Sequence, residues 1–453
     1  MRDPTEETRE RIERIRRAIE AGDDHAALDA EIAELHPADL AEIIDLLEDG
    51  ERVELFRRIP PGMRAETLSE VDQDTWPELL EAVEAHSLRE LFENLEVDDA
   101  ADILGELTSE EAREILSRIE PEGSREIAAL MRYDEESAGG VMTTEMVTVP
   151  ADITADEAIV RVRERGREVA DFHTVWVVED EGRLAGAISL QDLILADGST
   201  LVRDVMRTDL VTVRPNMDQE DVARLIAKYN LVSIPVVDEF GRLLGRITVD
   251  DVIDIIEAEA TEDIFRLSGV DEEEERYASP AEIIRSRTPW LLITLATASL
   301  GAAIVAQFEE TIARIAFIAV FMPLVAAMAG NSAVQAMTVA VRRLALSGSA
   351  VKPLRSVLRE LTAGVVIGLV IAVLVGIGAA LWRGDVRVGL VVGGSMWLAV
   401  TVAVLWGAAI PILLDRAGLD PAVSSSVFLF TLTDIVSFVV ILWAASHFLV
   451  QVM

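Results

Sequence analysis

One carboxylate lies inside a stretch of sequence that is otherwise apolar enough to cross a membrane. Asp434 is embedded in SVFLFTLTDIVSFVVILW, with Thr431 and Ser437 three residues to either side. Side chains spaced in this way share one face of a helix. A carboxylate at such depth costs on the order of 2.5–3.5 kcal/mol, so it should face water or a protein partner rather than lipid. The pattern predicts an ion pathway, or else a structural Asp bonded to a neighbouring helix.

A second apolar stretch carries a polar stripe. In PLVAAMAGNSAVQAMTVAVRR, Asn331, Gln335 and Thr338 follow the spacing i, i+4 and i+7 and share one helical face. Such residues also occur in ordinary packing between membrane helices, where amides bond across the interface. Beside Asp434, the stripe favours a hydrated pathway lined by these two helices.

The soluble part of the chain holds two further groups of carboxylates. Both are dense, and like charges at these spacings repel unless a cation lies among them. They are therefore candidate sites for divalent cations, and the alternative is that they only solvate the surface. The first group is Asp98, Asp99 and Asp102, and the second is Asp251, Asp254, Glu259, Glu262 and Asp263.

The composition divides the chain into two parts, and each part must position some of these residues. The net charge is −40, yet 51% of the residues are hydrophobic and the mean hydropathy is +0.30. Residues before 289 hold 73 of the 80 acids, which predicts an acidic soluble part followed by a membrane part. Nucleic-acid binding is excluded, because phosphate contacts need a basic face. The first residues, MRDPTEETRERIERIRRA, are charged throughout and predict no secretory signal.

Two residue types argue against an enzyme. The chain has no Cys, which removes disulfides and thiolate chemistry, and its five His are scattered rather than clustered as in an intramembrane metalloprotease.

The basic residues indicate the kind of cell the protein comes from. Only Lys228 and Lys352 are lysines, and the other bases are arginines. An acid excess with almost no Lys is typical of proteins from a high-salt cytoplasm, where salt screens self-repulsion. The alternative is an acidic domain from a cell with GC-rich coding.

Five apolar stretches predict membrane helices, since each reaches the ~20 residues needed to span a bilayer. They cover 289–308, 315–341, 361–382, 388–414 and 426–451. With the acidic part in the cytoplasm, eight Lys and Arg near the spans lie inside and three lie outside, as the positive-inside rule requires. This orientation predicts that the C-terminus lies outside the plasma membrane.

The acidic part contains two patterns. Residues 25–138 show short helical segments broken by Pro, Gly and capping residues, and L35-HPADLAEII recurs weakly as L95-EVDDAADIL, which predicts helix pairs stacked in a superhelix. Further on, residues 174–194 predict strand, turn, strand and helix start, and residues 233–254 repeat this order. Each copy follows a helical stretch and a Val-Met phrase, at Val141-Met142 and Val205-Met206.

The repeated unit resembles a CBS-domain pair, through Pro235–Asp238, the hairpin between Gly241 and Gly245, and two Ser/Thr-x-x-Asp endings. The resemblance implies that an adenine nucleotide such as ATP binds in the cleft. Helix capping by the same residues needs no ligand and remains the alternative. The implied nucleotide positions are Ser189, Asp192, Thr248 and Asp251.

The assembly resembles the MgtE family of magnesium channels and transporters. The resemblance rests on SAGGVMT (137–143), the CBS pair, EATEDI (259–264), PLVAAMAGNSAVQAMT and LDPAVSSSVFLFTLTD. It implies a homodimer in lipid with its pore between subunits, Asp434 at the ion site, and further metal ligands at Glu220 and Asp420. The charge concentrated in the two acidic groups predicts gating by cytoplasmic Mg²⁺, which would bridge these groups and press the connector towards the pore.

The fold class expected is therefore multidomain: an α-helical N domain (1–138), an α/β CBS pair (139–257), a connecting helix (258–287) and an all-α domain of five membrane helices (288–453). Transport of another divalent cation such as Mn²⁺ or Co²⁺, or of a different solute, is the alternative function. A sensor that transports nothing is another. An anion pathway is disfavoured, because it would require Arg, Lys or helix N-termini where this chain has Asp434.

Overall fold

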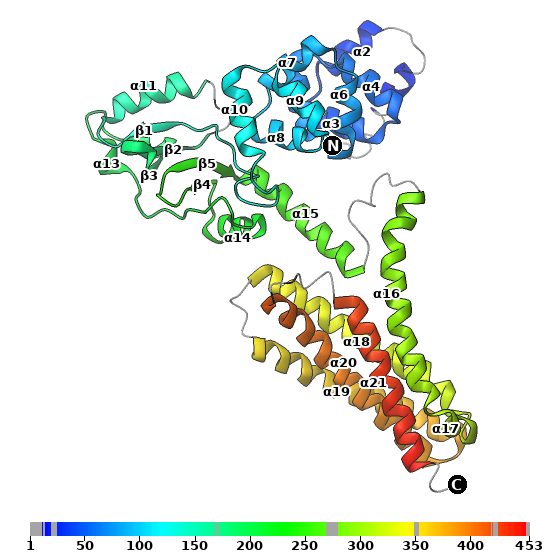
Figure 1. The fold of residues 1–453 in the computed structure, drawn as a ribbon. Coiled ribbons are helices and arrows are strands. Elements are labelled where there is room, and N and C mark those ends of the chain that lie inside the picture. Colours follow the sequence, from blue (N-terminus) through cyan, green and yellow to red (C-terminus); the bar gives the residue numbers. More distant parts are fainter. Residues whose placement is uncertain are drawn as a thin grey trace. The chain divides into compact units, whose positions relative to one another are not determined.

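The computed structural model describes residues 11, 14–19, 25–167, 169, 172–268, 280–347, 353–417, 419 and 425–449. Asp420 lies outside these residues, and so does the side chain of Asp263. The chain separates into two compact units, residues 1–255 and 256–453 (Figure 1). The expected class, with helices, then an α/β module, then membrane helices, is confirmed. The bounds of the four predicted domains stay predictions.

The first unit, which the sequence predicts to lie in the cytoplasm and which we call the cytosolic unit, begins with short helices. Several begin at Pro, whose missing N–H is tolerated in the first turn of a helix. Helix α3 packs against α5 and α8 packs against α10, so the weak sequence repeat corresponds to two helix pairs. The elements are α2 His25–Ile32, α3 Pro37–Leu46, α4 Asp49–Arg58, α5 Pro61–Glu70, η1 Gln73–Thr75, α6 Trp76–Glu81, α7 Ala85–Glu93, α8 Val97–Gly105, α9 Ser109–Leu116 and α10 Pro121–Leu130.

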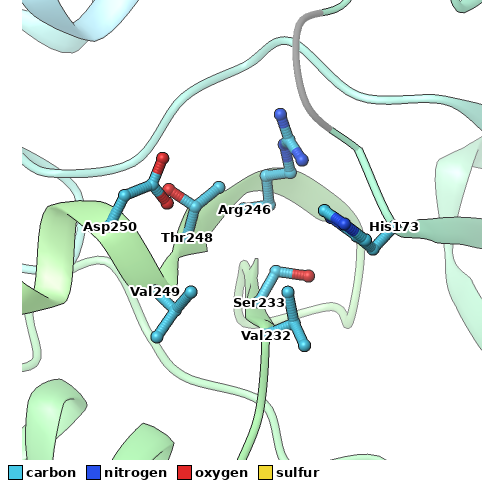
Figure 2. Close-up of a pocket in the computed structure, with 7 residues that line it drawn as sticks. All are labelled: His173, Val232, Ser233, Arg246, Thr248, Val249 and Asp250. Atoms are coloured by element: carbon cyan, nitrogen blue, oxygen red, sulfur yellow. The ribbon is translucent and has the colours of Figure 1, made fainter.

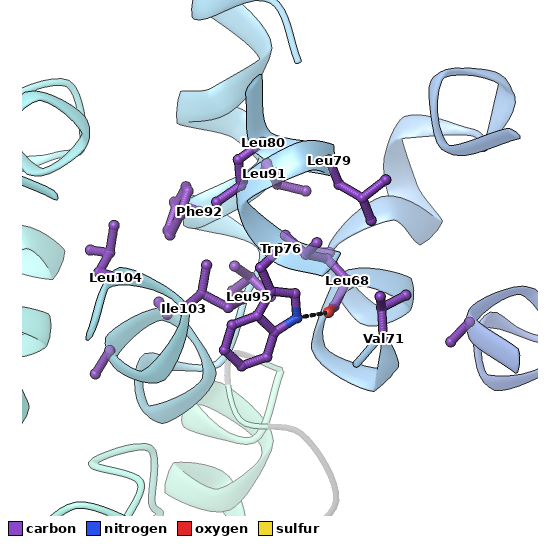
Figure 3. Close-up of a cluster of buried hydrophobic side chains, with 14 of the residues drawn as sticks. Leu68, Val71, Trp76, Leu79, Leu80, Leu91, Phe92, Leu95, Ile103 and Leu104 are labelled. Atoms are coloured by element: carbon purple, nitrogen blue, oxygen red, sulfur yellow. Dashed lines mark hydrogen bonds between the residues drawn. The ribbon is translucent and has the colours of Figure 1, made fainter. Parts of the chain in front are cut away.

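An apolar core joins these helices (Figure 3). Trp76 is buried at its centre, and its indole Nε1 donates a hydrogen bond to the backbone oxygen of Leu68 at 2.9 Å. The bond satisfies the polar atom that burial of a Trp would otherwise leave without a partner. The same core continues through Ile103 and Leu104, on the inner face of α8. This packing holds the opposite, acidic face of α8 in a fixed position.

The second part of the cytosolic unit is the repeated α/β module. Strands β1, β2 and β3 form one sheet, with β1 parallel to β2 and β2 antiparallel to β3, while β4 and β5 form an antiparallel pair. The predicted strand, turn, strand and helix order is confirmed in both copies. The elements are β1 Thr148–Pro150, α11 Ala155–Arg165, β2 Thr174–Val178, η2 Asp180–Gly182, β3 Leu184–Ser189, α12 Leu190–Leu195, α13 Val202–Val205, α14 Gln219–Tyr229, β4 Ser233–Val237, β5 Leu243–Thr248 and α15 Val249–Ser268.

The two halves of this module exchange their leading segments. The Val-Met phrase before the first half lies on β5 of the second, where an added Cβ on Gly245 would be 2.6 Å from the backbone oxygen of Thr143. The phrase before the second half lies on β3 of the first, where a Cβ on Gly186 would be 2.7 Å from the backbone oxygen of Arg207. Glycine is required at both positions, because any side chain would displace the exchanged segment.

The membrane unit contains, among its described residues, five helices long and apolar enough to span a bilayer, which confirms the predicted number. Helix α16 runs through Pro289, so the helix extends beyond the N-terminal end of the first apolar stretch, and the start of the span within it stays a prediction. Membrane helices tolerate Pro because neighbouring groups satisfy the freed backbone carbonyl. The described part of the predicted connector therefore belongs to two helices, α15 and α16. The helices are α16 Pro280–Ala306, α17 Glu309–Arg314, α18 Ile318–Ser347, α19 Pro353–Arg383, α20 Val386–Arg416 and α21 Ser425–Phe448.

Small residues let the central membrane helices approach closely. A Cβ added to Gly376 of α19 would be 2.8 Å from the backbone oxygen of Gly389 on α20. Gly407 of α20 lies against the backbone of Ala333 on α18 and likewise leaves no room for a side chain. Close backbone contact of this kind is a main source of helix association in membranes. It makes α20 the centre of the unit, between α18, α19 and α21.

Candidate functional site

Helix α8 presents three carboxylates near its start. Asp98 and Asp99 lie in the first turn and Asp102 one turn later. The positive end of the helix dipole favours acids at these positions. Asp98 is only 9% exposed, and its Oδ1 has no hydrogen-bond partner among the described residues. A buried carboxylate oxygen without a partner is costly, so Asp98 is the member of this group that most requires a ligand.

Asp251 of α15 faces these three residues. Its carboxylate accepts hydrogen bonds from the backbone N–H of Thr248, at 3.1 Å, and from the Thr248 hydroxyl, which caps the start of α15. Its negative charge adds to burial in raising the pKa of each α8 carboxyl. The structure thus brings together the first predicted acidic group and one member of the second.

Burial and mutual repulsion change the proton affinity of this cluster, which we call the acidic cluster (Asp98, Asp99, Asp102 and Asp251). Burial, reinforced by neighbouring carboxylates, raises the pKa of Asp98 well above its usual range and that of Asp99 and Asp102 to about 7. The pKa of Asp251 is also raised by burial, against the hydrogen bonds from Thr248. Concentrated, desolvated negative charge of this kind attracts cations.

The cluster has a neighbour that sequence reasoning missed. Glu145 lies in the segment before β1, and burial together with the charge of Glu96 raises its pKa to about 7. Arg246 opposes this shift, and its Nε donates to the backbone oxygen of Glu145 at 2.9 Å. Glu145 and Arg246 are 101 positions apart in the chain, so no local pattern indicated that they meet.

As placed, the carboxylates do not form a closed metal site. Among the described residues, no three His, Cys, Asp or Glu side chains converge closely enough to hold one ion. Mg²⁺ keeps several of its waters and binds proteins through one or two carboxylates. All the donors in the acidic cluster are carboxylates, and one buried oxygen among them, Asp98 Oδ1, has no partner among the described residues. These donors therefore fit a hydrated hard cation.

The other predicted metal ligands have local partners or lie at the surface. Glu220 pairs with Arg224 on α14, and Glu262 pairs with Arg266 on α15. Asp254 is exposed and Glu259 is half-buried. Neither the contacts of these residues nor their exposure assigns them a metal, and their roles stay predictions.

A cavity of about 230 Å³ lies between the two halves of the α/β module (Figure 2). His173 comes from the first half, and the other lining residues come from the second: Val232, Ser233, Arg246, Thr248, Val249 and Asp250. Of the predicted nucleotide positions, only Thr248 lines this cavity. Ser189 caps α12 by accepting from the backbone N–H of Asp192 at 3.0 Å, which confirms the capping interpretation and leaves the nucleotide role untested.

In the membrane unit, α18 and α21 meet near the two predicted polar stripes. The Phe430 ring of α21 lies against Gly330 of α18, 3.6 Å from the position of an added Cβ. Asn331, Gln335 and Thr338 of α18 are exposed in the single chain. Thr431 and Asp434 of α21 are half-buried. Ser437 is fully buried, and its Oγ has no hydrogen-bond partner among the described residues.

Known proteins match three parts of this architecture. The family model described as a divalent cation transporter, MgtE, matches residues 322–444, that of the MgtE intracellular N domain matches 35–136, and the CBS model matches 138–199 and 202–258. The magnesium transporter MgtE of Enterococcus faecalis is 38% identical over 325 residues, 71% of each chain. That of Thermus thermophilus is 39% identical over 320 residues, 70% of this chain and 71% of the relative.

The chain belongs to the MgtE family. Solved structures support the fold of its cytosolic part. The cytosolic domain of the Mg²⁺ channel MgtE in complex with ATP aligns with a TM-score of 0.51 and 38% identity, covering 53% of this chain and 98% of that structure. The soluble part of a magnesium transporter aligns with a TM-score of 0.50 and 29% identity, covering 56% and 99%. The acidic cluster and the cavity thus lie within the part of an MgtE protein that has been solved by itself.

Proposed function

We propose that this protein is a Mg²⁺ channel or transporter of the plasma membrane that cytoplasmic Mg²⁺ closes. One observation carries the proposal: Asp434 is the acid that lies deepest in the predicted spans, on a helix that packs against the polar α18. Relatives named as magnesium transporters give the cation, and the donor chemistry agrees. Hydrated Mg²⁺ requires few charges and many oxygen or amide contacts.

The pore proposed here requires a second copy of the chain. Asn331 and Gln335 lie on a helix of the membrane unit, and amides facing hydrocarbon would be costly. A homodimer that places α18 and α21 of both copies around one axis would cover them, together with Thr338, and line a hydrated path. Two Asp434 side chains would then supply two negative charges, with Thr431 and Ser437 on the same helix. In this arrangement the C-terminus would lie outside the cell.

Closure by cytoplasmic Mg²⁺ is supported by the acidic cluster. Without a cation, the three carboxylates of α8 repel one another and Asp251 of α15. Bound Mg²⁺ would remove this repulsion and favour the compact state, which provides the difference in affinity that a population shift needs. Helix α15 continues to Ser268 and carries Glu259, Glu262 and Asp263, so compaction would act on the segment leading to the membrane. Glu220 and Asp420 are proposed as further metal ligands.

Two further properties belong to the same proposal. An adenine nucleotide such as ATP would bind the cavity at Thr248, because a relative's cytosolic domain was solved with ATP and the cavity offers a guanidinium, an imidazole and hydroxyls. The acid-rich, Lys-poor composition supports a cell with high internal salt. In such a cell, the acidic cluster can respond to Mg²⁺ only if it binds divalent ions much more strongly than the abundant monovalent ions.

The test is Mg²⁺ flux into proteoliposomes containing purified protein. Asp434→Asn keeps the side-chain size and removes the charge, and flux should fall at least tenfold while the dimer still assembles. Asp415→Asn, an exposed acid at the end of α20, is the matched control and should transport normally. Unchanged flux through Asp434→Asn would refute the pore, and faster flux of Mn²⁺ or Co²⁺ than of Mg²⁺ would favour the alternative cation.

A further inference from the structure

Strand β5 carries an arginine into the interior of the cytosolic unit. Arg246 is only 4% exposed, and its Nε donates to the backbone oxygen of Glu145 at 2.9 Å. Its own backbone N–H and C=O each pair with Thr143 at 2.9 Å, so the exchanged segment holds the residue in place. A buried charge is strongly destabilising unless opposite charges lie close to it. Packing alone therefore does not account for Arg246 at this position, and nearby negative charges must stabilise it.

The charge of Arg246 acts on the carboxylates around it. Burial raises the pKa of Asp251 and of Glu145, and the nearby guanidinium partly offsets the increase for both. Arg246 and Thr248 are two residues apart on β5, so their side chains lie on one face of the strand, as Figure 2 shows. Thr248 in turn holds the carboxylate of Asp251. The guanidinium thus acts on Asp251, the member of the acidic cluster that Thr248 holds.

We propose that Arg246 is a resident counter-cation of the acidic cluster, and that its charge sets the Mg²⁺ concentration at which the cluster fills. The inference rests on the proposed closure by Mg²⁺ and names the residue that tunes its threshold. The guanidinium is covalently tethered to β5, so it is present at every Mg²⁺ concentration. It weakens repulsion in the empty cluster and also repels an incoming cation. Both effects move the threshold in the same direction, towards higher Mg²⁺.

The experiment uses the full chain in lipid nanodiscs. Protease protection of the cytosolic unit is followed during a MgCl₂ titration at constant ionic strength. Arg246→Met removes the charge and keeps most of the side-chain length, and it should lower the Mg²⁺ midpoint by about three- to tenfold, as expected for a unit charge acting at short range in a partly buried site. Arg246→Lys keeps the charge and should stay within about twofold of the wild type.

A matched control removes the same charge elsewhere. Arg242 lies on the exposed hairpin of the same half, where it pairs with Asp238 at 2.6 Å. Arg242→Met should leave the midpoint unchanged, which separates a local effect from a change in net charge. An unchanged or higher midpoint in Arg246→Met would overturn the inference. So would a midpoint in Arg246→Lys as low as that of Arg246→Met, since the charge would then be irrelevant.

A second variant covers the case in which Arg246→Met does not fold. Arg246→Met combined with Glu145→Gln is compared with the wild type at about pH 8.5, where Glu145 is ionised. It then removes one positive and one negative charge together, so the midpoint should return close to the wild-type value at that pH. A midpoint displaced by about tenfold in the double variant would overturn the inference. Wild-type protein that shows no Mg²⁺-dependent protection would instead refute the proposed closure itself, and the two failures are thereby distinguished.

Discussion

Replacing Asp99 by Asn should flatten the pH dependence of the stability of the cytosolic unit in the absence of divalent cations. Burial and neighbouring carboxylates raise the pKa of Asp99 from 3.8 to about 7 in the folded protein. Between these two values the folded state holds a proton that the unfolded state has released. Stability must therefore fall as the pH rises through this interval, since it increases with pH only where the unfolded state binds more protons.

The size of the effect follows from the difference in pKa. Each unit corresponds to about 1.36 kcal/mol, so the full interval of roughly three units is worth about 4 kcal/mol for one carboxyl. Between about pH 5.5 and 7.5 the unfolded group is already ionised and the folded group titrates. Over this narrower range Asp99 alone should lower the free energy of unfolding by about 2 kcal/mol. Asp102, whose pKa is also raised to about 7, adds to the slope.

The assay is urea unfolding of residues 1–268 in EDTA at several pH values, because the corresponding part of two relatives has been solved by itself. Asp99→Asn should lose about 2 kcal/mol of the pH-dependent change. Asp74→Asn, which removes an exposed acid from η1, is the control and should keep the wild-type slope. A wild-type free energy of unfolding that is flat or rises between about pH 5.5 and 7.5 would refute the argument. Saturating Mg²⁺ should reduce the slope, because a bound cation lowers the pKa of its ligands.

Three other changes have expected outcomes. Gly407→Ala pushes a methyl group into the backbone of Ala333 and should lower the stability of the membrane unit by about 1–3 kcal/mol, measured by thermal unfolding. Gly378 has open space around it, so Gly378→Ala should not lower the stability. Trp76→Phe removes the indole donor from the Leu68 carbonyl, which then keeps only the backbone N–H of Val71 at 3.4 Å, at a cost of about 0.5–1.5 kcal/mol in urea unfolding of the cytosolic part. Asn331→Cys, in a chain with no other Cys, should form a crosslinked dimer on oxidation in membranes, and a monomer that still transports would contradict the proposed pore.

Local patterns predict the elements of this fold well, because capping and periodicity are properties of neighbouring residues. Thr248 and Asp251 cap α15 as their spacing indicates, and the strands and helices of both CBS halves lie where the pattern places them. The helix that carries the first apolar stretch begins well before Pro289, because a proline need not end a helix. In a helix that begins at Pro280, the one N–H missing at Pro289 is too weak an interruption to end it.

The surroundings of the acidic cluster are less predictable. Asp98 and Asp251 stand out as acids in dense groups, but their meeting depends on how α8 packs against the CBS pair. Glu145 and Arg246 give no signal at all, because one is an ordinary acid in a connecting segment and the other a single Arg within a strand. Ser437 illustrates the same limit in the membrane unit: its spacing places it on the face of Asp434, yet it is fully buried within a single chain.

The exchange of leading segments within the CBS pair has a mechanical consequence. Thr143 and Arg246 form two backbone hydrogen bonds of 2.9 Å across one crossing, and Ala187 and Arg207 form two of 2.9 and 2.8 Å across the other. Neither half can rotate against its partner without breaking both sets of bonds at once. The pair should therefore move as one rigid body, so that a displacement of the first half is passed on to β5 and α15 instead of being absorbed by a hinge between the halves.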